Sequence, residues 1–216
     1  MKFSKKIIRW YRDNKRELPW RKTTDPYKIW LSEIILQQTR IDQGTNYYLR
    51  FITQYPDRES LANASEEEIL KLWQGLGYYS RARNLHKTAK AISQDLNGVF
   101  PNTYEDLVKH KGIGEYTAAA IASIAFGVSK PVVDGNVLRF LARFHGVSLP
   151  INSSEGKNEI KKLVEELIDQ EQPGDFNQAI MEFGALVCKP QNPDCKSCIF
   201  KHECIALTED KVKSFR

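Results

Sequence analysis

Four cysteines lie in the last 29 residues, at Cys188, Cys195, Cys198 and Cys204, with the spacing C-x6-C-x2-C-x5-C. Such clustering favours a metal site over disulfides in a reducing compartment. Zinc ribbons usually carry two C-x-x-C pairs and zinc fingers add histidines, whereas only one such pair is present. Unevenly spaced thiolates also suit an iron–sulfur cluster, so the pattern alone leaves zinc and iron–sulfur open and makes metal-free cysteines a poorer explanation.

A single carboxylate, Glu33, lies in the otherwise apolar stretch IWLSEIILQQT, residues 29–39. A buried carboxylate is unfavourable unless it is paired or stays protonated. It is either a structural group that caps a helix or pairs with an arginine, or an acid in a functional site, and this stretch alone gives the two about even weight.

The segment HKGIGEYTAAAIASIAFG, residues 110–127, contains two glycines one residue apart. Gly112 and Gly114 can adopt backbone geometry closed to other residues, and the helix that follows would direct free N–H groups at whatever approaches the turn. This arrangement suits a DNA phosphate. An ordinary turn between helices is the alternative, because a lone G-x-G is a weak signal.

The elements that position these groups are helices. Asp25 and Pro26 predict an N-cap and a first helical residue, with the helix running to about Thr39. Ser65 and Glu68 have capping-box spacing, and no sustained alternation predicts a strand. We therefore expect an all-α protein of about ten short helices.

Composition narrows the class of protein without fixing its function. The chain has 216 residues, 41% of them hydrophobic, and a formal charge of +5 from 32 basic and 27 acidic residues. A modest basic excess permits a polyanionic partner without requiring one. No apolar run has membrane-spanning length and the N-terminus carries no secretory pattern, so we expect a cytoplasmic protein.

Five separated motifs carry a resemblance: LPWR (18–21), DPYKIWLSEIILQQT (25–39), WQGLGYYSRARNLHKTA (73–89), DGNV (134–137) and FNQAIMEFGALVC (176–188). With the glycine hairpin and the cysteines, the chain resembles the endonuclease III-related helix-hairpin-helix DNA glycosylases, and within them the A/G-specific adenine DNA glycosylase family. The resemblance implies two helical lobes with the active site in the cleft between them. Residues 1–25 plus 131–216 would form the lobe with a 4Fe-4S cluster on the four cysteines, and residues 26–130 the lobe with the hairpin, at about 104–127.

The resemblance also assigns catalytic roles. Glu33 would protonate the adenine leaving group, and Asp134 would stabilise positive charge on the sugar, with or without transient covalent attachment. Asp134 is equally a natural N-cap. Asn136 would support the acid and a water. Tyr116 occupies the position at which strand-nicking relatives carry a lysine, so we expect a monofunctional enzyme that leaves an abasic site.

DNA contacts follow from the same resemblance. Gln38 and Tyr78 match wedge positions that fill the gap left by a flipped base, and Thr39 and Leu76 would flank the opposite base. Without the resemblance, these residues would be an exposed helix end and ordinary packing. The residues expected at the adenine pocket are Arg21, Gln178 and Glu182. Those expected at DNA phosphates are Lys111, Gly112 and Gly114. Three further basic residues either contact phosphate or form a solvated face: Arg81, Arg83 and Lys87.

The expected partner is double-stranded DNA with an A:8-oxoguanine or A:G mispair, bound by a monomer associated with the nucleoid. Two departures qualify this. The family's hairpins often have Leu-Pro where this chain has His110-Lys111. Family members also continue into a domain that reads oxidised guanine, so this chain corresponds to the catalytic portion without that domain.

Two other functions stay open. One is a thymine or uracil mismatch glycosylase, because short members of the superfamily share the tyrosine and aspartate. The other is a non-catalytic, metal-stabilised DNA-binding module. Such a module has no need for Glu33 and Asp134, whose removal would leave its duplex affinity intact or improve it.

Overall fold

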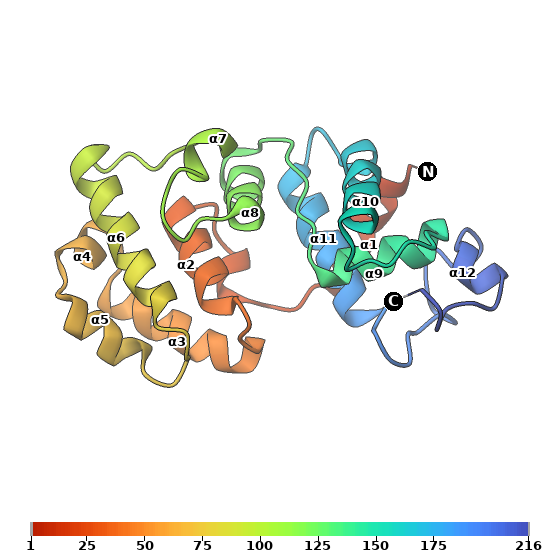
Figure 1. Cartoon of the computed structure of the whole chain (residues 1–216), viewed down its shortest axis with the longest axis horizontal. Coiled ribbons are helices and arrows are strands. Elements are labelled where there is room, and N and C mark those ends of the chain that lie inside the picture. Colours follow the sequence, from red (N-terminus) through yellow and green to blue (C-terminus); the bar gives the residue numbers. More distant parts are fainter. Residues whose placement is uncertain (1, 216) are drawn as a thin grey trace. The chain divides into compact units, whose positions relative to one another are not determined.

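The computed structural model describes residues 2–215, and this part of the chain is helical with no strand, which confirms the all-α prediction. Its elements are α1 (Phe3–Asn14), η1 (Pro19–Arg21), α2 (Pro26–Leu36), α3 (Ile41–Gln54), α4 (Arg58–Asn63), α5 (Glu66–Trp73), α6 (Ser80–Asp95), α7 (Tyr104–Leu107), α8 (Glu115–Phe126), α9 (Gly135–His145), α10 (Ser154–Leu167), α11 (Pro173–Leu186) and α12 (Ile205–Thr208) (Figure 1). None of the described helices has the length and apolar character needed to cross a membrane.

The chain divides into two compact units. The first combines the N-terminal segment up to Arg16 with the chain from Ser129 onward, and the second is Glu17–Val128. Each unit has a hydrophobic cluster of its own. The lobes expected from the resemblance divide at residues 25/26 and 130/131 and stay a prediction.

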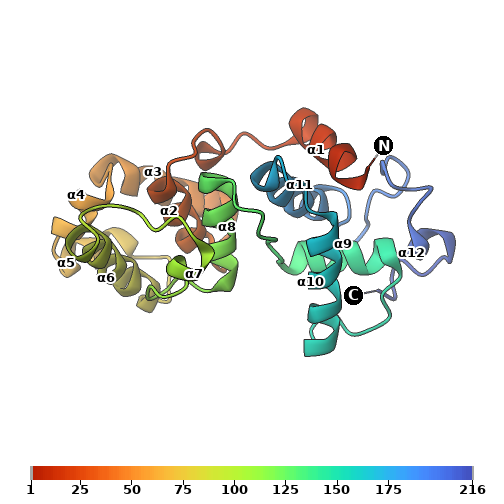
Figure 2. The same cartoon turned by 90° about the horizontal axis from the view of Figure 1, so that it is seen from above.

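Helix α2 runs through the hydrophobic cluster of the second unit and contacts α3, α6 and α8 (Figures 1 and 2). Its start is as predicted: the Asp25 side chain accepts the backbone N–H of Tyr27 at 2.9 Å, and Pro26 is the first helical residue. Its end is earlier than predicted, at Leu36 instead of Thr39. Gln37 leaves helical geometry with ψ 114°, and Gln38 has φ +54°.

The hairpin consists of α7, a glycine turn and α8. Gly112 needs to be glycine, because its φ is +82° and a Cβ there would lie 2.8 Å from Cβ of Asn84. The Thr88 hydroxyl of α6 secures this turn by donating to the Lys111 carbonyl at 2.8 Å. Gly114 differs from the prediction: it is the N-cap of α8 at φ −81°, and a Cβ there would have no neighbour within 4 Å. Its backbone is open to other residues.

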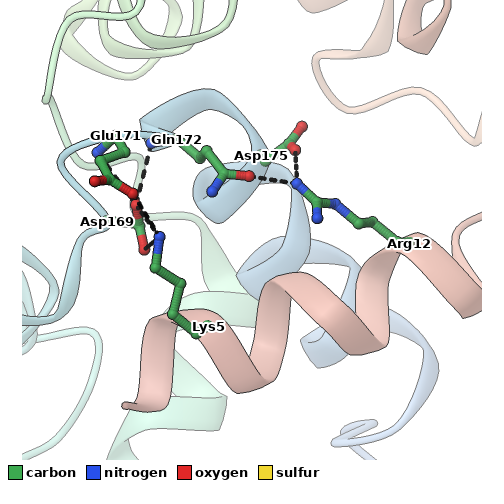
Figure 3. Close-up of polar contacts among 6 residues, drawn as sticks. All are labelled: Lys5, Arg12, Asp169, Glu171, Gln172 and Asp175. Atoms are coloured by element: carbon green, nitrogen blue, oxygen red, sulfur yellow. Dashed lines mark hydrogen bonds and ion pairs between the residues drawn. The ribbon is translucent and has the colours of Figure 1, made fainter. Parts of the chain in front are cut away.

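Helix α1 belongs to the first unit because it packs against α11 near the other end of the sequence. Figure 3 shows the polar contacts along this packing. Lys5 Nζ lies 3.2 Å from an oxygen of Asp169 and 2.8 Å from one of Glu171. Further along, Arg12 donates to Gln172 and pairs with Asp175.

Candidate active site

Glu33 and Tyr116 lie on two helices that pack against each other, α2 and α8. Both side chains are half-buried, Glu33 between the buried residues Ser32 and Ile34, and Tyr116 in the first turn of α8. Thr117, next to Tyr116, accepts a hydrogen bond from Gln37 Nε2 at 3.4 Å, which ties the start of α8 to the end of α2. Glu33 is thus neither sealed in the core nor on an open face.

The two predicted wedge residues are exposed and share an unusual backbone conformation. Gln38 has φ +54° and Tyr78 has φ +44°, and 66% of Tyr78 is exposed. Their predicted companions differ from them in burial: Thr39 is half-buried, and Leu76 is only 8% exposed.

Asp134 is the N-cap of α9 and accepts hydrogen bonds on both carboxylate oxygens. Oδ1 accepts the backbone N–H of Val137 at 2.8 Å, and Oδ2 accepts Nδ2 of Asn136 at 2.8 Å. The capping role proposed from sequence is therefore real. Each carboxylate oxygen therefore has one donor that fixes its orientation.

Asn136 is held in turn by Arg139, whose Nη2 donates to Asn136 Oδ1 at 3.0 Å and to the Gly184 carbonyl at 2.7 Å. Gly184 lets α11 approach this closely, since a Cβ there would lie 2.6 Å from the Asn136 carbonyl oxygen. Arg139 Nε donates to the carbonyl of Cys188 at 2.9 Å. One arginine therefore connects the Asp134 pair with the start of the cysteine loop.

All four cysteines line a single pocket, whose walls are mainly aromatic and aliphatic residues of α9, α11 and the C-terminal loop. Arg143, 2% exposed, donates to the Cys188 sulfur at 3.5 Å and to the Lys189 carbonyl at 2.7 Å. Cys204 Sγ donates to the carbonyl of Arg143 at 3.5 Å. The pocket is thus lined by all four cysteines and by a buried arginine that contacts one of the four sulfurs.

Burial raises the pKa of the Cys198 thiol to about 11. The pKa values of Cys195 and Cys204 are also raised, first by burial, while Arg143 acts in the opposite direction on both. Thiolates in such a pocket need compensating positive charge beyond this arginine. Within residues 2–215, no group of three or more His, Cys, Asp or Glu side chains is arranged to hold a single metal ion.

Glu182 and Gln178, expected at the adenine pocket, lie one turn apart on α11 and both contact the N-terminal segment. Glu182 is 1% exposed, and Arg16 donates to it from Nε at 2.9 Å and from its backbone N–H at 3.0 Å. Gln178 accepts the Tyr11 hydroxyl at 3.0 Å. Arg21, the third expected pocket residue, is half-buried in η1 of the other unit.

Sequence reasoning missed three arginines, Arg16, Arg139 and Arg143. Arg139 and Arg143 are one helical turn apart in NVLRFLARFH and share a buried face of α9. Two arginines spaced by four within an apolar stretch were the available signal. Arg16 gave no such signal, because it is one of several charges near the N-terminus.

The predicted site residues are distributed over both units. The second unit carries Arg21, Glu33, Gln38, Thr39, Leu76, Tyr78, Lys111, Gly112, Gly114 and Tyr116, and the first carries Asp134, Asn136, Gln178, Glu182 and the cysteines.

The model of one protein family, the HhH-GPD superfamily base excision DNA repair proteins, matches residues 31–170. The chain belongs to this superfamily. The match begins within α2, extends past the end of α10, and includes Glu33, the hairpin and Asp134.

Adenine DNA glycosylases from a bacterium and from human are similar to this chain in sequence. The chain is 39% identical to the adenine DNA glycosylase of Buchnera aphidicola subsp. Baizongia pistaciae over 97% of its own length and 60% of that protein. It is 43% identical to the Homo sapiens adenine DNA glycosylase over 94% of its length and 39% of that protein. The chain thus spans only part of the length of these relatives.

Among solved structures, a thermostable thymine-DNA glycosylase superposes with a TM-score of 0.87 at 30% identity, covering 96% of this chain and 95% of that one. A non-covalent endonuclease III–DNA complex superposes with a TM-score of 0.79 at 24% identity, over 96% and 94% of the two chains. The second likeness concerns the fold alone.

Proposed function

We propose that this HhH-GPD protein is a DNA glycosylase that removes adenine mispaired with 8-oxoguanine or guanine. The observation that carries the proposal is the similarity over almost the full chain to adenine DNA glycosylases from a bacterium and from human. The reaction breaks the N-glycosidic bond, adds water to the sugar and releases adenine, leaving an abasic site.

Glu33 is the proposed general acid. Its half-buried position in an apolar helix suits a carboxyl group that protonates N7 of adenine as the base leaves. Asp134 is the proposed stabiliser of the positive charge that develops on the sugar, and Asn136 orients it. The proposed reaction requires both carboxylates to act on the same nucleotide. Glu33 and Asp134 belong to different units of the chain.

DNA is the proposed partner, bound as a duplex by a monomer. The turn at Lys111, Gly112 and Gly114 precedes the first N–H groups of α8, which can bind a phosphate oxygen. Gln38 and Tyr78 would enter the base stack while the adenine is extruded. Arg21, Gln178 and Glu182 are the residues proposed to contact the extruded adenine, and Thr39 and Leu76 those proposed to contact the opposite base.

A 4Fe-4S cluster is the proposed cofactor. Four cysteines in one pocket, with the buried Arg143 guanidinium donating to the sulfur of Cys188, fit an inorganic cluster with thiolate ligands, because the arginine offsets thiolate negative charge. Cys188, Cys195, Cys198 and Cys204 would hold it. When bound, the cluster supplies cross-links that fix the C-terminal loop against α9 and α11.

The enzyme is proposed to be monofunctional. Tyr116 stands where a lysine would be needed to attack the sugar and form a Schiff base, and a phenol cannot do so. Strand breakage should therefore require alkali after the base has been lost.

Thymine excision from a T:G mispair is the second candidate, because a thymine-DNA glycosylase matches this chain nearly end to end. Its identity, 30%, is below the 39% and 43% of the adenine enzymes. This higher identity supports proposing adenine as the first candidate substrate.

Single-turnover excision from duplexes carrying A:8-oxoguanine, A:G, T:G and U:G tests the proposal, with each product analysed before and after hot alkali. We expect alkali-dependent cleavage of the adenine strand. Cleavage of the T or U strand would move the protein to the mismatch enzymes, and binding without cleavage would leave a DNA-binding module.

A further inference from the structure

Among residues 2–215, five non-glycine residues have positive φ: Gln38, Tyr78, Asn97, Asn192 and Asp210. Asn and Asp adopt this conformation readily, because their short side chains bond locally. Gln38 and Tyr78 lack that advantage, so surrounding contacts must hold them there.

Arg81, at the start of α6, contacts both segments. Its Nη1 donates to the carbonyls of Ile34 at 3.0 Å, Ile35 at 3.2 Å and Gln37 at 2.5 Å. Its Nη2 donates to the carbonyl of Leu76 at 3.2 Å. The acceptors are the open end of α2, just before Gln38, and the loop just before Tyr78.

Two aromatic rings also lie near the guanidinium. Its central carbon lies 5.1 Å from the ring centre of Trp73 and 5.8 Å from that of Tyr78. Burial lowers the pKa of Arg81, and none of the ion pairs found in the described residues involves it. From sequence, Arg81 was expected at a phosphate or on a solvated face. In the structure its guanidinium is half-buried and binds backbone carbonyls, and the phosphate contact stays a prediction.

Arg81 is the group that joins the two segments. In the loop from Gln74 to Gly77 each carbonyl accepts a different side chain, in order Tyr47, Gln43, Arg81 and Trp73. Of these four side chains, Arg81 alone also binds the end of α2 through the carbonyls named above. A planar fork of donors suits this task, whereas an ammonium group has a different geometry and reach.

We infer that Arg81 is a positioning residue that holds Gln38 and Tyr78 in left-handed backbone conformations, ready to enter the base stack together. This inference rests on the proposed function for its effect on DNA. The effect of Arg81 on the backbone of the free protein does not depend on that function. The positioning role and the proposed function can therefore fail separately.

The first experiment compares Arg81→Lys with the unchanged protein in amide hydrogen exchange without DNA. Exchange should accelerate at residues 37–39 and 76–79 and stay unchanged in the interior of α8. The control is Arg83→Lys on the same helix, whose exposed side chain pairs with Glu66 at 3.2 Å. Equal exchange at those two segments in all three proteins would overturn the inference.

The second experiment measures single-turnover excision and fluorescence of 2-aminopurine placed at the target base. Arg81→Lys should slow excision about tenfold or more and reduce flipping, since displaced groups cost rate steeply, while affinity for an undamaged duplex stays near its original value. Tyr78→Ala should slow excision less in the Arg81→Lys background than in the unchanged protein. If Tyr78→Ala slows excision by the same factor in both backgrounds, the inference is overturned.

Arg81→Met is the second variant, since it keeps an unbranched apolar side chain and loses every hydrogen-bond donor of the guanidinium. Both variants should remain folded at the assay temperature. Loss of the folded state in both would contradict the inference, because Arg81 would then support the core of the unit. If the unchanged protein excises no adenine, the proposed function is refuted. The hydrogen-exchange result would still show whether Arg81 holds Gln38 and Tyr78 in place.

Discussion

Asn136 donates a hydrogen bond from Nδ2 to Oδ2 of Asp134 at 2.8 Å and accepts one from Arg139 on its Oδ1 at 3.0 Å. The amide thereby fixes the carboxylate in a rotamer that also caps α9 through Val137. Such an arrangement separates the two tasks of Asp134: one oxygen supports the helix, and the other is held by a side chain that can be changed without removing the cap.

Changing Asn136 to Ala removes this support and leaves the Asp134–Val137 bond in place. We expect single-turnover excision of adenine to fall about tenfold to a hundredfold, because the carboxylate gains freedom to rotate, with little change in duplex affinity. Asn46→Ala, at an exposed position of α3, is the control. An Asn136→Ala protein as fast as the control would show that Asp134 needs no such orientation.

Changing Glu182 to Gln tests the buried ion pair of the first unit. The substitution leaves Arg16 facing a neutral amide in a position that is 1% exposed, and we expect the free energy of unfolding to fall by about 2 kcal/mol. Urea unfolding measures this. Glu165→Gln, on α10, is the control. Unchanged stability would mean that solvent screens the pair.

The carboxyl of Asp169 predicts a loss of stability in acid. Burial would raise its pKa, but hydrogen bonds from Lys5, from Ser4 and from the backbone N–H groups of Glu171 and Gln172 outweigh burial, and the pKa lies below its ordinary 3.8. A lowered folded-state pKa stabilises the protein above the unfolded-state value, and this contribution is lost as the pH falls through the folded-state value.

Melting temperatures of the unchanged protein and Asp169→Asn should therefore converge below about pH 4 and differ above it. Several other carboxyls, such as Asp57 and Asp106, also have lowered pKa values, so only the difference between the two proteins is informative. Asp13→Asn, an exposed change on α1, is the matched control. A gap for Asp169→Asn that persists in acid would refute the assignment.

Changing Cys198 to Ser tests the metal centre. We expect purified Cys198→Ser to contain less iron, to lose its brown colour and to melt at a lower temperature, because a hydroxyl is a poor ligand for iron–sulfur clusters. Lys196→Ala, an exposed change in the same loop, should keep its iron. Zinc in place of iron in the unchanged protein would contradict the cluster.

Local signals were sufficient for the starts of two helices, α2 and α5. The cap at Asp25, the proline after it and the capping box of Ser65 with Glu68 all involve neighbours within three residues, and the structure confirms them. The end of α2 was predicted too late, and its terminal carbonyls bind a remote group, Arg81, more than forty positions away. A sequence does not reveal which carbonyls a distant guanidinium will reach.

In the candidate site too, contacts between residues close in sequence were predictable and contacts between distant residues were not. Asp134 and Asn136 are close in sequence, so their pairing on one helix start was within reach of motif reasoning. The partner of Glu182 lies at Arg16, and Arg139 links Asn136 to Cys188 across more than forty residues. These contacts depend on how α1, α9 and α11 pack, and no local pattern encodes that packing.

The most direct test of the account is the effect of Glu33→Gln on single-turnover excision from the A:8-oxoguanine duplex, with Glu67→Gln at an exposed position of α5 as the matched control. Glutamine keeps the shape of the side chain and cannot donate a proton from oxygen. We predict that Glu33→Gln slows excision by a factor of about 10² to 10⁴ while it still binds the duplex, and that Glu67→Gln behaves as the unchanged protein. Excision by Glu33→Gln at the rate of the control would contradict the assignment of Glu33 as the acid that releases adenine.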